Sequence, residues 1–120
     1  EDLLKIITKS LDNKLNEIKI KWRNIKCMTI VLCSKGYPGK YKKNNIINNL
    51  RKIKKGKNFF IFHAGTKLFN NKVIAVGGRV LNVSSTGYSF KEIRNKILNI
   101  IKKINWKNGF FRKDIGSRVI

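Results

Sequence analysis

Short apolar runs closed by turn-forming residues constrain the fold of this chain most strongly. Met28 to Cys33 is apolar except for Thr29, and it leads into the turn-rich segment 34–39, Ser-Lys-Gly-Tyr-Pro-Gly. Phe59 to His63 is a second short run, and Ala64-Gly65-Thr66 follows it. Runs of this length that end at glycine, proline or asparagine are typical of β-strands. The sequence therefore predicts a sheet built from short strands.

Four further segments favour strands. Lys67 to Phe69 and Lys72 to Val76 flank Asn70-Asn71, and asparagine tolerates the positive φ angles of a two-residue hairpin turn. Gly77-Gly78 interrupts this pattern before Arg79 to Val83 begins another strand. Glu17 to Trp22 alternates apolar and polar residues, which also predicts a strand.

Two segments repeat their apolar residues at helical spacing. Asp2 to Leu15 predicts a helix that enters from an upstream domain. Ser89 to Glu92 has the pattern of a capping box, and the helix that it opens is expected to run to about Ile104. Asn44 to Lys57 is polar and lysine-rich, and it is expected to form a short irregular helix or a loop.

These elements together predict an α+β fold. We expect a small antiparallel sheet of the hybrid type with one long amphipathic helix. A length of 120 residues suits one compact domain, with a piece of a neighbouring domain at its start. Trp22 and Trp106 are expected in the core or in interdomain packing.

The composition makes a membrane-spanning or secreted protein unexpected. The apolar runs are far shorter than the roughly 18 residues that a spanning helix needs. The chain opens with Glu1-Asp2, without a basic and then apolar leader and without an initiator Met. We therefore expect an excised or incomplete polypeptide of the cytoplasm.

The two cysteines, Cys27 and Cys33, are six positions apart. On an extended strand this separation spans about 20 Å at about 3.3 Å per residue, whereas a disulfide needs Cα atoms within about 7 Å. We therefore expect free thiols in a reducing compartment. Because His63 is the single histidine and no CxxC pair occurs, a zinc site is not expected.

The formal net charge of +22 has two interpretations. It predicts attraction to phosphate-rich partners, which makes a small basic RNA- or DNA-binding protein, such as a ribosomal protein, the alternative function. Yet lysine, asparagine and isoleucine make up nearly half of the chain, and all three have A/T-rich codons. The cations are mostly lysines spread over predicted strands, loops and helix. We interpret the charge mainly as mutational drift, and specific nucleic-acid binding is not expected.

Acidic residues are scarce beyond the N-terminal region. After Glu17 the chain contains only Glu92 and Asp114. A Mg²⁺–ATP site normally uses carboxylate oxygens, and general acid–base catalysis needs titratable groups in suitable positions. The sequence therefore predicts no catalytic residues and no metal ligands in this chain, and it predicts that other segments carry the chemistry.

Four segments in register resemble one family. They are residues 34–39 (SKGYPG), 62–66 (FHAGT), 77–83 (GGRVLNV) and 111–118 (FRKDIGSR). Their order and spacing are similar to the C-terminal region of phosphoribosylamine–glycine ligase, also called glycinamide ribonucleotide synthetase. The similarity covers nearly the whole chain. The chain departs from the family's usual small residues at Cys33 and Lys35, and from its usual apolar residues at 84–86.

The resemblance implies an ATP-grasp ligase of purine biosynthesis, which joins glycine to 5-phosphoribosylamine through a glycyl phosphate. It implies that ATP and Mg²⁺ (or Mn²⁺) are bound by upstream ATP-grasp domains that these residues do not include. Residues 1–22 would end the ATP-grasp region, and residues 23–120 would form the C-terminal domain that helps to enclose the phosphoribosyl substrate. The chain alone is expected to bind ATP negligibly and to be inactive.

The resemblance also implies roles for particular residues. The candidates for contact with the substrate phosphate are Arg112, Lys113 and Arg79. Arginine offers a planar fork to phosphate oxygens, and lysine adds a point charge. The candidates for supporting loops are Gly36, Tyr37, Pro38, Gly39, His63 and Asp114.

Each candidate has a structural alternative. Asp114 could pair with Arg118 or Arg79 and hold a neighbouring guanidinium in place. The alternative is that the cations near the C-terminus form only a surface salt-bridge cluster. Residues 36–39 are either an anion-binding nest of N–H groups or a structural turn. Gly77-Gly78 either brings Arg79 to a cleft or only bends a hairpin, and His63 could be structural. A degenerate remnant without activity is disfavoured by the intact motifs.

Overall fold

The apolar runs form two antiparallel sheets in the computed structural model, which describes residues 1–54 and 56–120. The larger sheet has the strand order β3-β6-β1-β7, and the smaller one has the order β2-β5-β4. The helices and strands are α1 (Leu3–Leu11), β1 (Lys26–Ser34), β2 (Asn45–Ile47), β3 (Phe59–His63), β4 (Thr66–Phe69), β5 (Lys72–Ala75), β6 (Arg79–Gly87), α2 (Phe90–Lys103) and β7 (Gly109–Phe110). Three short 3₁₀ helices, η1 (Leu15–Glu17), η2 (Leu50–Lys52) and η3 (Ser117–Val119), complete the described elements. The predicted α+β class is confirmed.

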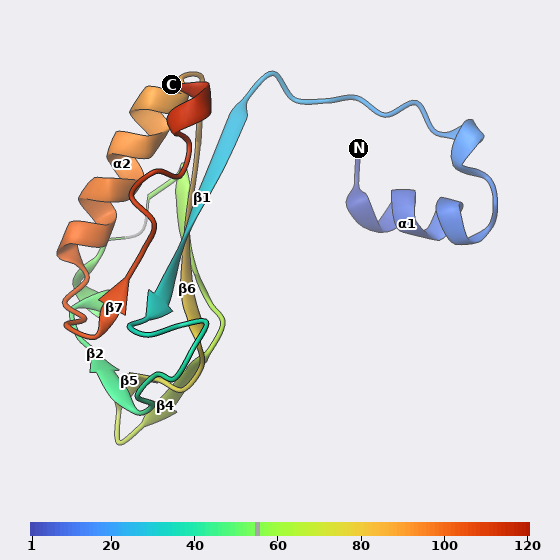
Figure 1. Cartoon of the computed structure of the whole chain (residues 1–120). Coiled ribbons are helices and arrows are strands. Elements are labelled where there is room, and N and C mark those ends of the chain that lie inside the picture. The colour runs from blue at the N-terminus through green and yellow to red at the C-terminus, as the bar shows by residue number, and fades with distance from the viewer. Residues whose placement is uncertain (55) are drawn as a thin grey trace.

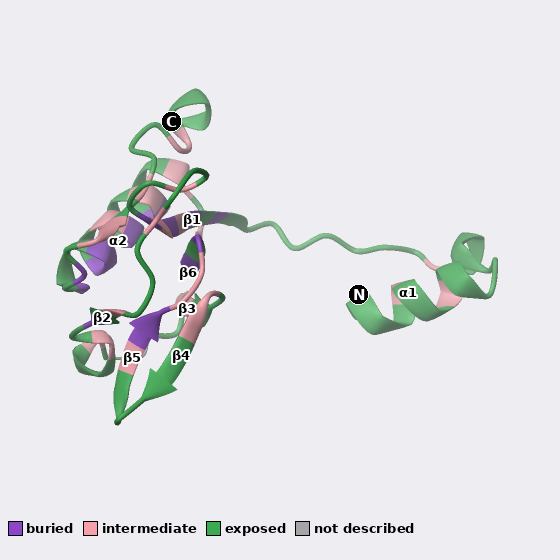
Figure 2. Ribbon diagram, turned by 60° about the horizontal axis from the view of Figure 1, so that its bottom comes forward, coloured by how far each residue is buried: buried purple, intermediate pink, exposed green. Residues whose placement is uncertain are grey.

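The core lies between α2 and one face of the larger sheet (Figure 1). Met28, Ile30 and Leu32 of β1 are buried on this face, and Ile93 and Ile97 of α2 pack against them. Figure 2 shows the buried residues gathered where α2 meets β1 and β6. Alternation along a strand places every second side chain on the opposite face. The larger sheet therefore has a covered face and an open face.

Two serines of the central strand β6, Ser84 and Ser85, are buried. The Oγ atoms of Ser84 and Thr29 lie 2.7 Å apart, and the Ser85 hydroxyl donates to the carbonyl oxygen of Asn58 at 2.7 Å. A buried hydroxyl with a hydrogen-bond partner avoids most of the desolvation cost of its burial. These bonds explain how the polar residues fit into the central strand β6.

The predicted hairpin is confirmed. Strands β4 and β5 pair through Phe69 and Lys72, and the turn between them consists of Asn70 (φ 45°) and Asn71 (φ 60°). Both asparagines adopt the left-handed conformation that this residue tolerates better than most others. The hairpin extends from the lower end of the larger sheet in Figure 1.

The N-terminal segment differs from the prediction. Helix α1 ends at Leu11 because Asn13 adopts φ 57°, which breaks the helical backbone before Leu15. The strand predicted over residues 17–22 is wrong, since residues 18–25 belong to no strand and Trp22 is 88% exposed. Figure 1 shows α1 apart from the sheets, joined to β1 by an extended segment. An alternating pattern alone cannot form a strand without a neighbour to pair with.

Other expectations have mixed outcomes. Trp106 is in the core, as predicted. Ser89 is the N-cap of α2, but its side chain makes no capping hydrogen bond, so the predicted capping box is wrong.

The segment 44–57 contains β2 and η2, while Lys55 lies outside the described residues. Both cysteines are free thiols, as expected, and no helix among the described residues combines the length and the apolar character needed to cross a membrane.

Candidate functional site

Three of the four sequence motifs meet at one end of the larger sheet. The segment 34–39 follows β1, the segment 64–66 follows β3, and Gly77-Gly78 precedes β6. The Ser34 amide donates to the Gly78 carbonyl at 2.8 Å, and its hydroxyl donates to the Gly77 carbonyl at 2.7 Å. The Gly65 amide donates to the Arg79 carbonyl at 3.0 Å. These bonds join the three loops into one structural unit, which we call the loop end.

Glycine allows the strands of the loop end to approach one another closely. A Cβ atom on Gly65 would lie 2.7 Å from the Gly77 Cα atom and from the Arg79 carbonyl oxygen. A Cβ atom on Gly78 would overlap the ring of Tyr37. Side chains at these positions would separate the backbones or displace the aromatic ring. Gly77-Gly78 therefore lets the backbones pack closely, and Gly78, Arg79 and Tyr37 line one hollow.

The turn over residues 36–39 offers few free N–H groups to an anion. The amide of Tyr37 donates to the Ser34 carbonyl at 3.0 Å, and Pro38, which follows a cis peptide bond, has no N–H. Gly36 adopts φ 102°, a conformation that favours glycine. An anion-binding nest needs several successive free N–H groups. The geometry therefore favours the structural turn, whose effect is to place Tyr37 against Gly78.

Arg79 lines a hollow of about 470 Å³ on the open face of the larger sheet. The hollow is lined by Val31, Tyr37, Ala64, Gly78, Arg79 and Asn82. Within residues 1–54 and 56–120, the Arg79 guanidinium takes part in no ion pair and no side-chain hydrogen bond. Burial raises the pKa of the Cys33 thiol, and the positive charge of Arg79 opposes this shift. Arg79 is thus an unpaired cation at the edge of a concave surface.

Arg112 has a different environment, because it forms an ion pair with Asp114. Its Nε and Nη2 atoms donate to the two carboxylate oxygens at 3.1 and 2.6 Å. This fork geometry lowers the pKa of Asp114 below its ordinary value and raises the pKa of Arg112. The expectation that Asp114 pairs with Arg118 or Arg79 is wrong. Its partner is Arg112, which stands two positions away on the same exposed loop.

The tail that carries Arg112 and Lys113 is held along the sheet and α2. Arg94 of α2 donates from Nε to the Ile115 carbonyl at 3.0 Å and from Nη2 to the Lys113 carbonyl. Gly116 (φ 80°) lies against Met28, which is near the start of β1, whereas Arg79 pairs with Cys33 near its end. The tail therefore runs away from the loop end, and neither Arg112 nor Lys113 lines the hollow of Arg79.

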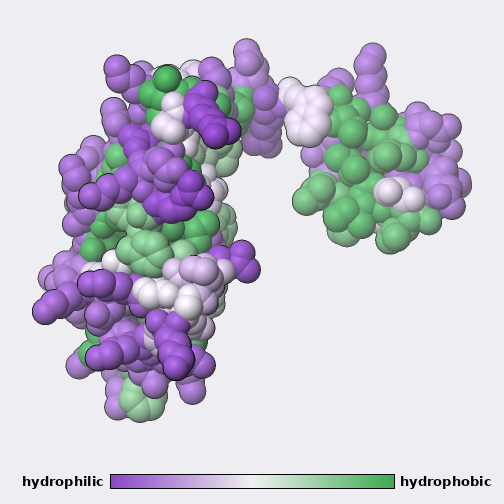
Figure 3. All heavy atoms as spheres, in the orientation of Figure 1, coloured by the Kyte–Doolittle hydropathy of each residue, from purple (hydrophilic) through white to green (hydrophobic). Residues whose placement is uncertain are grey.

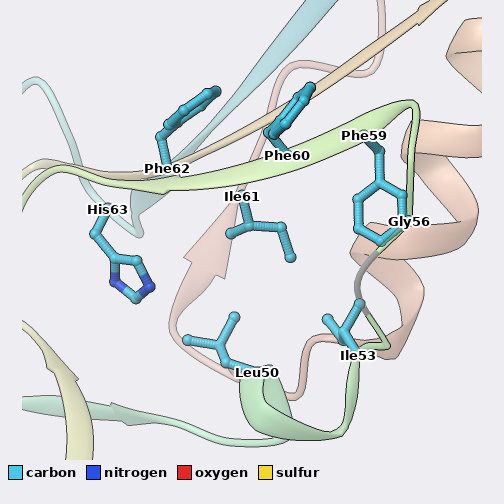
Figure 4. A pocket seen from close by; sticks show the side chains of 8 residues that line it. All are labelled: Leu50, Ile53, Gly56, Phe59, Phe60, Ile61, Phe62 and His63. Atoms are coloured by element: carbon cyan, nitrogen blue, oxygen red, sulfur yellow. The ribbon is translucent and has the colours of Figure 1, made fainter.

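His63 also lies apart from Arg79. Its side chain, with Ile61, points from β3 toward Leu50 and Ile53 (Figure 4), and together they help to line an apolar hollow of about 510 Å³. The Nδ1 atom of His63 lies 3.0 Å from the Thr66 hydroxyl. This bond to the next strand fits the structural role that the sequence left open.

Reasoning from the sequence did not identify Asn82 and Val31 as neighbours of Arg79. The alternation along β1 could have indicated Val31, because residues at odd positions of this strand lie on the open face. Val31 pairs with Asn82, and Cys33 pairs with Arg79 after a register shift between Leu32 and Cys33. The shift itself depends on the pairing of two strands, so that no local pattern indicates it.

Comparisons of the sequence with known proteins point to one family. The family model "Phosphoribosylglycinamide synthetase, C domain" matches residues 27–118. The phosphoribosylamine–glycine ligase of Agrobacterium fabrum is 40% identical over 119 residues, which are 99% of this chain and 28% of that protein. The chloroplastic ligase of Arabidopsis thaliana is 38% identical over an alignment of 121 residues, which covers 99% of this chain and 23% of that protein. The chain thus spans about a quarter of the length of these relatives.

A solved structure supports the fold. The crystal structure of phosphoribosylamine–glycine ligase from Thermotoga maritima superposes with a TM-score of 0.67 at 24% identity. The match covers 90% of this chain and 27% of that one. At this sequence identity, the superposition shows that the two proteins share the arrangement of sheets and helix.

Proposed function

Because the chain belongs to the phosphoribosylglycinamide synthetase C-domain family, we propose that it supplies one part of a phosphoribosylamine–glycine ligase. In this proposal the whole enzyme uses ATP to join glycine to 5-phosphoribosylamine in purine biosynthesis. The share of the relatives' length that the chain spans, 28% for the bacterial relative, supports a role as one part among several. ATP and Mg²⁺ (or Mn²⁺) are assigned to upstream ATP-grasp domains.

The residues of this chain do not fit a Mg²⁺ site of their own. Mg²⁺ needs oxygen ligands at near-ideal octahedral positions. Asp114 is engaged by Arg112, and Glu92 lies alone in the first turn of α2. Among the described residues no three metal-ligating side chains gather. The proposed contribution of the chain is therefore binding and enclosure of substrate.

Arg79 carries the proposal. It is an arginine without an ion-pair partner in the part of the chain that the structure describes, and it stands at a hollow of about 470 Å³ beside Tyr37 and Asn82. A guanidinium can donate two parallel hydrogen bonds to a phosphate group. Tyrosine hydroxyl and asparagine amide groups can donate to further phosphate oxygens. We assign the 5-phosphate of phosphoribosylamine to this hollow.

Arg112 and Lys113 are proposed as secondary contacts. A phosphate that binds Arg112 must compete with Asp114, whose two oxygens already accept from the guanidinium. Lys113 is exposed and its backbone carbonyl is held by Arg94. For the tail to close over a substrate phosphate, the Arg112–Asp114 pair must therefore open or turn as a unit.

The division of the chain at residue 22 also belongs to the proposal. Helix α1 has no buried residues, and its apolar side chains Leu3, Leu4, Ile7 and Leu11 are 47–79% exposed. Figure 3 shows this hydrophobic surface on the separate N-terminal segment. Apolar stripes of this kind normally face a partner. We assign residues 1–22 to the end of an ATP-grasp region and residues 23–120 to the C-terminal domain.

The experiment is a kinetic comparison in an active ligase that contains this chain. Arg79→Ala is expected to raise the KM for phosphoribosylamine by roughly 10- to 150-fold, which corresponds to the ~1.5–3 kcal/mol of a charged hydrogen bond. The KM for ATP should change little. Arg23→Ala, which removes an exposed arginine from the segment before β1, is the matched control. An unchanged KM for phosphoribosylamine in Arg79→Ala would remove Arg79 from the site.

Two further measurements bear on the whole proposal. The 120-residue chain alone should show no glycinamide ribonucleotide synthesis and negligible ATP binding by calorimetry. Localisation of the tagged protein tests the proposed cytoplasmic location, for which the chloroplastic plant relative is a counterexample within the family.

The alternative function, a small basic RNA- or DNA-binding protein, receives no support from the named relatives, which are all ligases.

A further inference from the structure

A second hollow, lined by lysines, lies beside the loop that follows β1. It has a volume of about 470 Å³ and is lined by Lys35, Lys40, Tyr41, Lys42, Asn45 and Asn108. These residues come from the loop after β1, from the start of β2 and from the segment before β7. It shares no lining residue with the hollow of Arg79. We call it the lysine hollow.

Hydrogen bonds between the segments hold the lysine hollow in shape. The Asn108 amide nitrogen donates to Asn45 Oδ1 at 2.7 Å, and Asn45 Nδ2 donates to the Lys42 carbonyl at 2.8 Å. The Lys35 amide donates to the Asn108 carbonyl at 2.8 Å. Both asparagines are partly buried. The backbone positions of Lys35 and Lys42 are thus set by a connected network, and a rigid support reduces the entropy cost of binding.

The charges of the lysine hollow are not compensated by this chain. The three ion pairs of the described residues involve Lys5, Lys9 and Arg112, and none of the lysines of the hollow. No carboxylate lines the hollow. Ammonium groups that share one concave surface repel one another, and a multivalent anion that enters relieves this repulsion. The arrangement therefore favours an anion with more than one negative charge.

We propose that the lysine hollow binds a small anion that carries two or three linked phosphate groups. Lysine provides point charges that adapt to several phosphate oxygens, and the Tyr41 hydroxyl and the asparagine amides supply further polar contacts. The volume is within the range of small-ligand sites, roughly 300–1,000 Å³. The lysine hollow shares no lining residue with the hollow of Arg79, so this site lies beyond the proposed binding of substrate phosphate.

The test measures binding of inorganic tripolyphosphate and pyrophosphate to the 120-residue chain at about 0.15 M salt, where nonspecific attraction is screened. Isothermal calorimetry gives the affinity, and amide NMR shifts locate the site. The triple variant Lys35→Gln, Lys40→Gln, Lys42→Gln is compared with Lys91→Gln, Lys102→Gln, Lys103→Gln on α2. Both variants lose the same charge. We expect about a tenfold or larger loss of affinity in the first variant and less than about threefold in the second.

Four outcomes would overturn the proposal. Three of them are equal losses in both triple variants, amide shifts that cluster away from residues 35–45, and absence of saturable binding in the unsubstituted chain. The fourth is stronger binding of a single-stranded oligonucleotide that tripolyphosphate cannot displace, which would favour a polynucleotide. Circular dichroism of each variant confirms that the fold is kept. In Arg79→Ala, tripolyphosphate should still produce the amide shifts at residues 35–45, so that this site and the proposed substrate site fail or succeed separately.

Discussion

The loop end and the tail both present an arginine to solvent, yet they differ in what surrounds its charge. Arg79 projects at a hollow and has no ion-pair partner within the described ranges, whereas Arg112 is held by both oxygens of Asp114. An arginine already paired in this way must exchange one anion for another when it binds phosphate. The accessibility of an arginine and its availability for a ligand are therefore separate properties. Because its guanidinium is not already paired, Arg79 is the better candidate for the phosphate contact than Arg112.

The largest expected effect comes from breaking the loop end itself. Gly65→Val places a side chain where the Gly77 Cα atom lies 2.7 Å from an ideal Cβ position. Forcing apart two hydrogen-bonded backbones is expected to lower the free energy of unfolding by about 2–3 kcal/mol. Urea unfolding of the 120-residue chain measures this loss. Gly39→Ala is the control, since its nearest atom, the Gly36 carbonyl oxygen, is 3.3 Å away. Equal stability of the two variants would contradict the close approach.

The next effect separates the two arginines directly. In an active ligase, Arg112→Ala is expected to raise the KM for phosphoribosylamine by less than about tenfold, below the effect of Arg79→Ala. The reason is that Arg112 loses its ion pair with Asp114 when it binds phosphate. Asp114→Asn sharpens the comparison, because it frees Arg112 and should lower that KM or leave it unchanged. A larger effect in Arg112→Ala than in Arg79→Ala would reverse the ranking.

A third effect, of similar size, concerns how the tail is attached. Arg94→Met removes the hydrogen bonds to the Ile115 and Lys113 carbonyls and keeps most of the aliphatic stem. The expected loss of stability is about 1–2 kcal/mol, with faster amide hydrogen exchange at residues 113–117 and unchanged exchange at the loop end. Lys96→Met, on the same helix, controls for the loss of a positive charge. Unchanged exchange in the tail would show that Phe111 and Ile115 hold it without Arg94.

The smallest effect is a titration. The ion pair with Arg112 keeps the pKa of Asp114 below its ordinary value of 3.8. The contribution of a carboxyl group with a lowered pKa is present above the ordinary value and is lost as the pH falls through the lowered one. Carboxyl-carbon NMR should show this lowered pKa, and Arg112→Ala should return it toward the ordinary value. A pKa of Asp114 that does not respond to Arg112→Ala would mean that the pair is not formed in solution.

Prediction from sequence succeeded where the signal was local. Strand β3 coincides with its predicted span, 59–63, and the asparagine turn joins β4 to β5 as expected. Helix α2 ends within one residue of the predicted end. Strands β2 and β7 were missed, because two or three residues carry no readable periodicity. The strand predicted over 17–22 failed for the opposite reason, since its alternation had no neighbouring strand.

The candidate site shows the same division. The motifs at 34–39, 62–66, 77–83 and 111–118 were recognised as the marks of one family, but it was not recognised that the first three meet through hydrogen bonds of Ser34 and Gly65. The partner of Asp114 was predicted wrongly, because several arginines were compatible with the sequence. Asn82, Asn45 and Asn108 were not recognised as lining residues, since each stands in an unremarkable local context. Their places in the two hollows depend on strands that meet from distant parts of the chain.

The sequence by itself determined which segments become strands and helices and where the backbone turns, because these depend on apolar spacing and on residues that tolerate special φ angles. It also determined that few carboxylates follow Glu17. Only the tertiary structure decided the order β3-β6-β1-β7 and the place of Arg79 at its hollow, where the described residues offer it no ion-pair partner. The physical reason is that the order of strands and the neighbours of a side chain in a hollow are set by the packing of segments that lie far apart in the sequence.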